Sequence, residues 1–417
     1  MKIFLVGGAV RDRLLNIPVK ERDWVVLGET PDSMIQHGFR PVGKDFPVFL
    51  HPQSHEEYAL ARTERKTAPG YKGFVIHADP DVTLEQDLLR RDLTINAMAM
   101  TPEGEIIDPF GGRNDLDNRI FRHISPAFSE DPVRILRVAR FAARYSHLGF
   151  CIADETQALM RQMIDSGEID YLVPERVWAE TQKALAERSP AAFFKVLKEC
   201  GALPKVFPEI DALFGVPQPE RFHPEIDTGL HCLLCLEQAS HLSPKPEVRF
   251  AALVHDLGKA LSPPEQWPHH YNHEQKGVPV LERLCARLRI PNTYKLLAKQ
   301  VMNHHSRCHR AFDLRASTLV DTLAHLGAFK TDNRLNDILL ACEADYKGRT
   351  GLENTAYPQA DFIKGAAKAA TGVDTSSVLQ NELRGPQIGE AIRHLRIKAV
   401  AGFIKEYQSG INTVAND

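Results

Sequence analysis

Residues 3–23 read IFLVGGAVRDRLLNIPVKERD, and this stretch decides the fold of the N-terminal part of the chain. A short apolar run ends in Gly7-Gly8, and an amphipathic segment follows over residues 9–15. This pattern predicts a strand, a glycine turn and a helix. Glycines at such a turn let backbone N–H groups approach a phosphate, and the helix N-terminus adds partial positive charge. The stretch therefore predicts a phosphate cradle, with a plain tight turn as the alternative.

Two carboxylates, Glu21 and Asp23, lead into a second apolar run at residues 24–27. Side chains alternate along a strand, so two residues that lie two apart face the same way. Neighbouring carboxylates repel each other unless a cation lies between them, and oxygen ligands suit Mg²⁺ that carries nucleotide phosphates. We therefore expect Glu21 and Asp23 to be a catalytic pair that holds Mg²⁺.

The combination of a Gly-Gly-x-x-Arg-Asp turn with this carboxylate pair resembles the polymerase-β type of nucleotidyltransferase. LVGGAVRD…KERDWVV resembles the class II tRNA nucleotidyltransferases, which comprise CCA-adding enzymes and related poly(A) polymerases. The resemblance implies that Gly8 and Arg11 help to bind the nucleotide. One departure is Glu21, where the family usually has Asp. A strand in this region often gives a third carboxylate, for which Glu57 is the candidate and an ordinary edge charge the equal alternative.

Apolar residues at helical spacing predict a helix over residues 85–100, with Arg90-Arg91-Asp92 inside it. The resemblance implies that Arg91 and Asp92 of this triplet hold the phosphate and ribose of the nucleotide. The basic, glycine-containing loop at residues 62–73 predicts mobility over a phosphate-rich site. The segment 108–122 matches the family motif that joins the catalytic head to a helical neck.

Residues 129–144, SEDPVRILRVARFAAR, predict a helix with Asp131 as N-cap and a proline in its first turn. Four arginines recur at helical spacing and fall on one face, which by itself is typical of a solvated face. A carboxylate beside a guanidinium matches the amino donor and ring-nitrogen acceptor that cytosine and adenine both present, and mismatches uracil and guanine. The family motif EDxxRxxR implies this role for Glu130, Asp131, Arg134 and Arg137, and Arg140 extends the predicted nucleotide-binding set.

Residues 150–222 are predicted to be all-helical, and a proline-rich connection marks a boundary near 222. Beyond it, histidines recur with a His-Asp pair in a predicted helix, which resembles the HD phosphohydrolase superfamily. Imidazole and carboxylate together suit a borderline divalent metal that activates water against a phosphate ester. Single histidines are more often structural, but the set as a whole is specific. The predicted ligands are His231, His255, Asp256 and His305, with His273 and Asp345 as further candidates.

A net charge of −3 over 417 residues argues against nucleic-acid binding over the whole surface, so a local basic patch is expected. Seven scattered cysteines indicate reduced thiols and a cytoplasmic protein, and Cys232-x-x-Cys235 is read as core thiols rather than a zinc site. No signal peptide or membrane span is predicted. Two last helices are expected at residues 358–370 and 386–407, the second with a basic face that is either solvated or a contact for RNA.

The sequence therefore predicts an α+β protein, with a polymerase-β-like nucleotidyltransferase head followed by an all-α neck and body and an all-α HD domain. The domains are expected at 1–125 (head), 126–222 (neck and body), 223–350 (HD domain) and 351–417 (tail).

The order of these domains resembles bacterial multifunctional CCA-adding enzymes. The resemblance implies addition of CCA to the tRNA 3′ end from CTP and ATP with Mg²⁺. It also implies hydrolysis of 2′,3′-cyclic or 2′-phosphates with Ni²⁺ or another transition metal, by a monomer or weak homo-oligomer. The alternatives are a bacterial poly(A) polymerase and an HD phosphohydrolase with a degenerate, RNA-binding head.

Overall fold

The structure is a computed structural model, and it describes residues 1–42, 47–66, 74–332, 334–376, 378 and 384–414. The chain folds into two compact units, each described here by itself. The first unit contains residues 1–184 and 192–206, and the second contains residues 185–191 and 207–417. The predicted loop at residues 62–73 is wrong for Thr63–Lys66, which form a strand, and residues 67–73 lie outside the described residues.

The first unit begins with a seven-stranded mixed sheet in the order β3-β4-β5-β2-β1-β8-β9. The predicted strand, turn and helix at the N-terminus are confirmed as β1, Gly7 and α1. Central strand β1 is antiparallel to β2, whereas β2 and β5 are parallel neighbours. The elements of this part are β1 (Lys2–Val6), α1 (Gly8–Leu14), β2 (Asp23–Leu27), α2 (Pro31–Gln36), β3 (Arg40–Val42), β4 (Val48–Leu50), β5 (Glu57–Leu60), α3 (Leu84–Leu89), β8 (Ala99–Met100) and β9 (Ile106–Ile107), with the separate hairpin β6 (Thr63–Lys66) and β7 (Phe74–His77).

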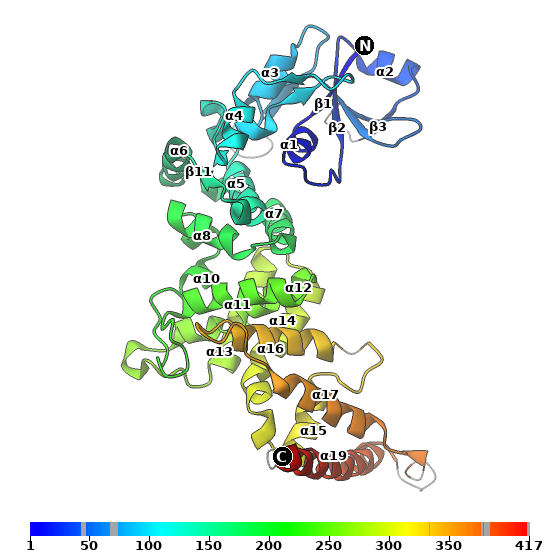
Figure 1. The fold of residues 1–417 in the computed structure, drawn as a ribbon, viewed down its shortest axis with the longest axis vertical. Coiled ribbons are helices and arrows are strands. Elements are labelled where there is room, and N and C mark those ends of the chain that lie inside the picture. Colours follow the sequence, from blue (N-terminus) through cyan, green and yellow to red (C-terminus); the bar gives the residue numbers. More distant parts are fainter. Residues whose placement is uncertain (43–46, 67–73, 333, 377, 379–383, 415–417) are drawn as a thin grey trace. The chain divides into compact units, whose positions relative to one another are not determined.

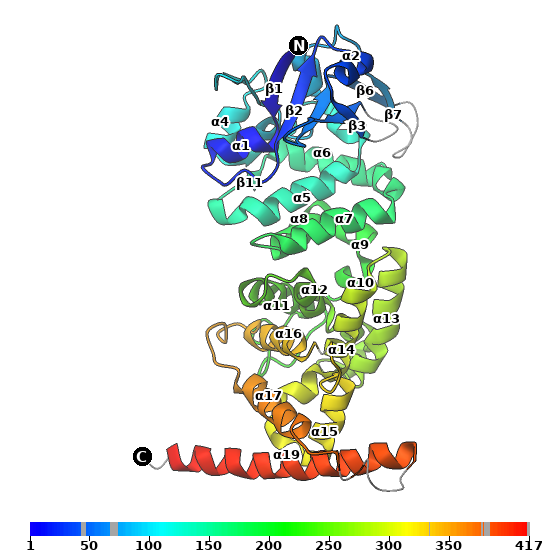
Figure 2. The same ribbon diagram turned by 90° about the vertical axis from the view of Figure 1, so that its right-hand side faces the viewer.

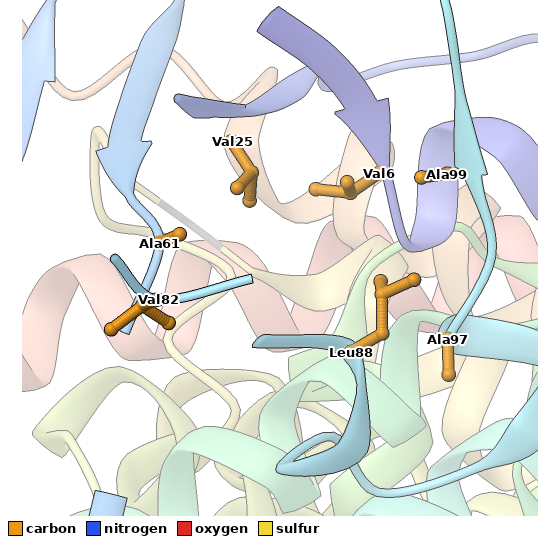
Figure 3. Packing of buried hydrophobic residues seen from close by; sticks show 7 residues of the cluster. All are labelled: Val6, Val25, Ala61, Val82, Leu88, Ala97 and Ala99. Carbon is orange, nitrogen blue, oxygen red and sulfur yellow. The ribbon is translucent and has the colours of Figure 1, made fainter. Parts of the chain in front are cut away.

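Both faces of this sheet are buried, because successive residues of β2 point to opposite sides. On one face Val6 and Val25 pack toward Leu88 of α3 (Figure 3). On the other face Val26 packs with Met34 of α2. These two apolar layers hold the strand ends, where the polar residues of the predicted site lie.

The predicted helix over residues 85–100 is wrong beyond Leu89. Helix α3 ends there, and a 3-10 turn at Thr94–Asn96 and the short strand β8 replace the rest. The reason lies in Asp92, whose Oδ1 accepts hydrogen bonds from the Leu93 N–H and the Asn96 side chain at 2.8 and 2.9 Å. Such local side-chain bonds compete with the helical ladder.

The rest of the first unit is a stack of helices built on the long, amphipathic α5. The prediction that residues 150–222 are all-helical is wrong at one point, since β11 pairs in parallel with β10. The elements are α4 (Gly112–Asp117), β10 (Ile120–Phe121), α5 (Val133–Tyr145), β11 (Cys151–Ile152), α6 (Asp154–Asp165), α7 (Pro174–Ala186), α8 (Ala191–Cys200) and α9 (Leu203–Val206).

The second unit is all-helical in its described part (Figure 1). Three of its helices, α11, α12 and α16, pack against one another, and α14 packs against α12 and α16. Its helices are α10 (Pro208–Asp211), α11 (Thr228–Leu242), α12 (Pro246–Val254), α13 (His273–Arg287), α14 (Asn292–His309), α15 (Ala316–His325), α16 (Leu335–Lys347), α17 (Pro358–Thr371) and α19 (Pro386–Val414).

The basic face predicted for the last helix is partly packed against protein. Figure 2 shows the long helix α19 alongside α15 and α17. Arg393 donates to both carboxylate oxygens of Asp321 at 2.7 and 2.8 Å, and Arg396 lies over the ring of Phe329 at 3.8 Å. These two arginines therefore fasten the helix to its own unit. Among the helices that the structure describes, none is both long and apolar enough to cross a lipid bilayer.

Candidate functional site

Three carboxylates lie together at one edge of the head sheet. Asp23 is the first residue of β2, and it pairs in parallel register with Glu57 of β5. Residues in register on neighbouring strands point to the same face, so Glu57 lies beside Asp23. Glu21 precedes the strand, so the expectation that alternation along one strand places both acidic residues is wrong for this residue. All three residues are exposed, as ligands for an incoming metal and nucleotide must be.

The charges of Glu21 and Arg91 both act on the carboxylate of Asp23. The side chain of Asp23 is exposed, yet partial desolvation by its surroundings raises its pKa. The positive charge of Arg91 lowers the pKa of Asp23, and the negative charge of Glu21 raises it. A carboxylate that lies beside a second negative charge favours a cation between the two. A set of carboxylate oxygens is the donor chemistry that Mg²⁺ prefers, so these residues fit the expected metal.

The glycine turn faces an arginine from the RRD triplet. Gly7 has a φ of 67°, and any Cβ at this position would lie 2.8 Å from Nη1 of Arg91. The positive φ favours glycine at this position, and the absence of a side chain lets the Arg91 guanidinium lie against the turn. Arg91 is held by Asp87, whose Oδ2 accepts from its Nη2 at 3.2 Å. The guanidinium thus lies against Gly7 at the start of α1, and its charge acts on Asp23, where a nucleotide phosphate is expected.

Arg11 lies in a buried network rather than facing open space. Its Nε and Nη2 donate to Oδ1 of Asp12 at 2.9 and 2.8 Å, and its Nη1 donates to Asn96. Asp12 also accepts from Tyr145 at 2.6 Å and from Arg144 at 2.8 Å. Arg11 is only 3% exposed. Arg11 therefore belongs to a hydrogen-bond network that joins α1 to α5. The network occupies its guanidinium, and the predicted contact of Arg11 with the nucleotide stays a prediction.

The arginine stripe of α5 ties the helix to the head and to α7. Each arginine has a partner on a different segment, which a solvated face would not require. Buried Asp92 illustrates the strength of these contacts: burial alone raises its pKa, but Arg137 and Asn96 hold that pKa well below its usual range. The pairs are Arg134 with the Ala127 and Arg90 carbonyls, Arg137 with Asp92 at 2.7 Å, Arg140 with Glu180 at 2.6 Å and Arg144 with Asp12 at 2.8 Å.

Asp131 pairs with an arginine that the sequence did not single out. Its two carboxylate oxygens accept from Nη1 and Nη2 of Arg176 on α7 at 3.0 and 2.7 Å. Its Oδ1 also accepts from the Val133 N–H. The predicted N-cap at Asp131 is wrong by one residue, because α5 begins at Val133 and Pro132 is its N-cap. Arg134 lies three residues along the chain and donates to two backbone carbonyls instead. No local spacing signals Arg176, because it lies 45 residues further along the chain.

In the second unit, the predicted HD residues converge in a buried cluster. His231 of α11 lies with Nε2 at 3.1 Å from Oδ1 of Asp345, and His255 Nε2 lies 3.5 Å from the same oxygen. His305 of α14 approaches Asp256 with Nε2 at 3.7 Å from Oδ1. All five side chains are at most 5% exposed. Asp345, a secondary candidate in the sequence, lies at the centre of the cluster.

The His-Asp pair converges rather than diverging. An uninterrupted helix would separate neighbouring side chains by about 100°. Helix α12 ends at Val254, and Asp256 has a φ of −107° and a ψ of 14°, outside the helical range. His255 Nε2 therefore lies 3.1 Å from Oδ2 of Asp256. The predicted helix is wrong for these two residues, and its end is what brings them to one site.

The cluster fits a divalent metal. Asp256 Oδ1 is buried and has no hydrogen-bond partner within the described residues, although His273 Nε2 lies 3.3 Å from it. His273, a further candidate in the sequence, is the first residue of α13. Burial alone lowers the pKa of His255, but the carboxylates of Asp256 and Asp345 raise it to about 10. A cation is therefore favoured at this position, and imidazole with carboxylate suits a borderline metal.

Some neighbours join the cluster and others do not. His304 points elsewhere, and its ring stacks on His325 at 5.6 Å between centroids. His309, one turn after His305, contacts Asp345 at 2.6 Å, and helical spacing could have identified it. Four more residues of the cluster were missed: Glu225, His223, Lys259 and Cys235. Lys259 lies three residues after Asp256, and Cys235, a buried thiol 3.3 Å from His231 Nε2, lies one helical turn after that histidine, so local spacing could have identified both. Glu225 and His223 come from the irregular segment before α11.

Family models match three successive parts of the chain. Residues 3–122 match the "Poly A polymerase head domain", residues 149–214 the "Probable RNA and SrmB- binding site of polymerase A", and residues 228–347 the "HD domain".

Relatives match nearly the whole length. A multifunctional CCA protein of Methylococcus capsulatus is 64% identical over 96% of this chain and 94% of its own. One of Thioalkalivibrio sulfidiphilus is 59% identical over 96% of this chain and 98% of its own.

Solved structures share the fold at lower identity. A Bacillus stearothermophilus CCA-adding enzyme in complex with CTP has a TM-score of 0.64 at 21% identity and covers 100% of this chain and 95% of its own. A Thermotoga maritima CCA-adding enzyme complexed with tRNA has a TM-score of 0.61 at 19% identity, over 98% of this chain and 91% of its own. The predicted fold class is thereby confirmed.

Proposed function

This chain belongs to the multifunctional CCA protein family, a CCA-adding nucleotidyltransferase with an HD domain, and from that premise we propose which of its residues perform each activity. The substrates proposed are a tRNA 3′ end, CTP and ATP, in keeping with the CTP and tRNA complexes of enzymes that share the fold. The proposed location is the cytoplasm, where tRNA is used. We keep 1–125, 126–222, 223–350 and 351–417 as the proposed domain limits.

For nucleotidyl transfer, Glu21, Asp23 and Glu57 would hold Mg²⁺. The metal supplies charge neutralisation at the triphosphate and activation of the tRNA 3′-hydroxyl. Arg91 would bind a phosphate over the Gly7-Gly8 turn, because its guanidinium lies against Gly7. The single observation that carries this assignment is the register of β2 and β5, which sets Asp23 beside Glu57.

Base selection would use Asp131 and Arg134 as the protein's own template. The carboxylate accepts from the exocyclic amino group of cytosine or adenine, and the guanidinium donates to the neighbouring ring nitrogen. Arg176 would hold the carboxylate plane through its two hydrogen bonds. Arg137 and Arg140 would fix α5 against Asp92 and Glu180, so that the templating edge keeps its place.

For phosphohydrolysis, the HD cluster would hold Ni²⁺ or another transition metal through His231, His255, Asp256 and Asp345, with His305 beside them. The metal supplies a water activated for attack on a phosphate ester. Lys259 Nζ contacts Asp256 Oδ2 at 2.6 Å and fixes that carboxylate. The proposed substrates are 2′,3′-cyclic and 2′-phosphates at damaged RNA ends.

The test is to incubate the purified protein with tRNA lacking CCA and labelled CTP or ATP. Addition of C, C and A that stops after one adenosine is expected. A long adenosine tract would indicate a poly(A) polymerase instead. No incorporation, together with metal-dependent hydrolysis of 2′,3′-cyclic AMP, would indicate an HD phosphohydrolase with a degenerate head.

A further inference from the structure

One arginine beside the HD cluster carries a charge that the protein does not pair. Arg349 follows α16, which ends at Lys347. Throughout the described residues, its guanidinium has no hydrogen-bond acceptor and no carboxylate within ion-pair distance, and its Nε is buried without a partner. A buried polar group without a partner costs free energy. Arg349 therefore offers an unsatisfied hydrogen-bond donor to a ligand bound at the neighbouring metal-binding cluster.

The chain on both sides of Arg349 is anchored to the cluster. A Cβ at Gly348 would lie 2.5 Å from Sγ of Cys235, so only glycine lets α16 approach α11 this closely. Cys235 in turn lies 3.3 Å from Nε2 of His231. On the other side, the Thr350 N–H donates to Oε2 of Glu225 at 3.3 Å, and Glu225 Oε1 lies 2.8 Å from His231 Nδ1. Arg349 therefore lies between Gly348 and Thr350. Gly348 contacts Cys235 and Thr350 contacts Glu225, and both of these contact His231.

The guanidinium makes a cation–π contact with its own segment. Its Cζ atom lies over the ring of Tyr346 at 5.4 Å to the centroid. Such a contact attracts the charge but supplies no hydrogen-bond acceptor, so the N–H groups stay available for a ligand. Its charge also reaches into the cluster: burial is the main cause that lowers the pKa of His223 to about 4, and Arg349 adds a smaller effect in the same direction.

We propose that Arg349 binds the phosphate group of the substrate at the HD site. The proposal rests on the phosphohydrolase activity proposed above and adds the residue that recognises the substrate. A guanidinium fork matches two oxygens of a phosphate, and the bonds are charge-assisted. Arg349 lies four residues after Asp345, so the same segment presents a metal ligand and an anion receptor. The substrate class is a terminal phosphate monoester or cyclic phosphate, whose non-bridging oxygens are accessible.

The test compares Arg349→Gln and Arg349→Lys with the control Arg283→Gln, which alters an exposed arginine on α13. The probes are inorganic phosphate, measured by calorimetry on metal-loaded protein, and 2′,3′-cyclic AMP, measured by steady-state hydrolysis. Arg349→Gln is expected to weaken phosphate binding and to raise KM about 10- to 100-fold, as loss of a charge-assisted bidentate contact does. Arg349→Lys should recover part of the loss, and Arg283→Gln should match the unaltered protein.

The controls separate this proposal from the one it rests on. Metal content and CTP incorporation are expected to be unchanged in Arg349→Gln, which shows that the fold and the cluster are intact. Normal phosphate affinity and KM in that variant, or loss of the bound metal, would overturn the role of Arg349, since the arginine would then only balance the charge of the cluster. If the unaltered protein hydrolyses no phosphate ester with any divalent metal, the phosphohydrolase assignment itself fails.

Discussion

The two candidate metal sites of this chain differ in almost every physical respect. In the head, Glu21, Asp23 and Glu57 are exposed, offer only oxygen ligands and lie at the end of a sheet. In the HD domain, His255 and Asp256 are 1% exposed and are surrounded by further imidazoles and carboxylates from four helices. The head site is open to solvent, whereas the HD site is enclosed by its own ligands.

This difference indicates two ways of using a metal. Exposed carboxylates remain hydrated when no metal is bound, so the free-energy cost of the metal-free state is small. The Mg²⁺ of the head site can therefore arrive with the nucleotide and leave with pyrophosphate. A buried cluster of carboxylates needs positive charge beside it to offset the cost of desolvation, which Lys259 and His255 supply in part and a metal ion would complete. The HD metal is therefore expected to stay with the protein. The predictions below test whether the two sites are also independent in function.

The largest expected effect is the loss of nucleotide incorporation in Asp23→Ala. Without this carboxylate the metal loses the ligand that the β2–β5 register places at the site, and several kcal/mol of charge stabilisation disappear. Incorporation of CTP and ATP should fall by about three orders of magnitude or more, while 2′,3′-cyclic AMP hydrolysis stays unchanged. Asp32→Ala, which alters an exposed carboxylate on α2, is the matched control. Normal incorporation by Asp23→Ala would mean that the metal binds elsewhere.

The reverse result is expected for the HD cluster. His255→Ala or Asp256→Ala should eliminate metal-dependent phosphohydrolysis, while CCA addition persists because the head has its own metal. His304→Ala is the control, since His304 neighbours His305 but its ring stacks outside the cluster. Both assays are run on one preparation, with metal content measured in parallel. Loss of both activities together would show that the two units depend on each other, and retained hydrolysis would make the His-Asp pair structural.

The sequence predicted one of these sites more fully than the other. In the head, the glycine turn and the two acidic residues lie within 20 residues, so local pattern was enough to find them. In the HD cluster, His231 and His255 came from the order of motif residues, whereas Glu225 contacts His231 from the irregular segment before α11, where neither a motif nor helical spacing signals it. Asp345 could be named but not placed, because its position depends on how α16 packs on α11.

The same limit explains the errors in secondary structure. Residues 85–100 have helical spacing, yet the buried hydrogen bonds of Asp92 end the helix early. Periodicity reports which residues are apolar, but it does not report whether a polar side chain will bond to its own backbone. The helix predicted through His255 and Asp256 failed in a comparable way, and in both cases the break lies at a candidate site.

A smaller effect is expected at the base-selecting pair Asp131 and Arg134. Variants of this pair should alter which nucleotide is added, whereas variants of the two metal sites should abolish a reaction. Asp131→Ala or Arg134→Ala should reduce selection of CTP and ATP over UTP and GTP by roughly 1–3 kcal/mol, about 5- to 150-fold. Arg176→Ala should move selectivity in the same direction, since it frees the Asp131 carboxylate. Competition assays with mixed nucleotides measure the change. Unaltered selectivity in all three variants would remove this pair from the templating role.

The smallest effect is expected for Glu21→Asp, which restores the residue usual in related enzymes. Glu21 precedes β2, so its backbone is not fixed by the sheet register that fixes Asp23. Because this segment makes no strand-pairing hydrogen bonds as part of β2, it can adjust to a side chain that is one methylene shorter. Incorporation should therefore be retained or raised, within about tenfold of the unaltered protein, which corresponds to about 1.4 kcal/mol. Glu21→Gln is the matched comparison, because it keeps the length and removes the charge. If Glu21→Asp is as inactive as Glu21→Gln, the longer side chain is itself required, and the open head site demands a ligand geometry as strict as that of the enclosed HD cluster.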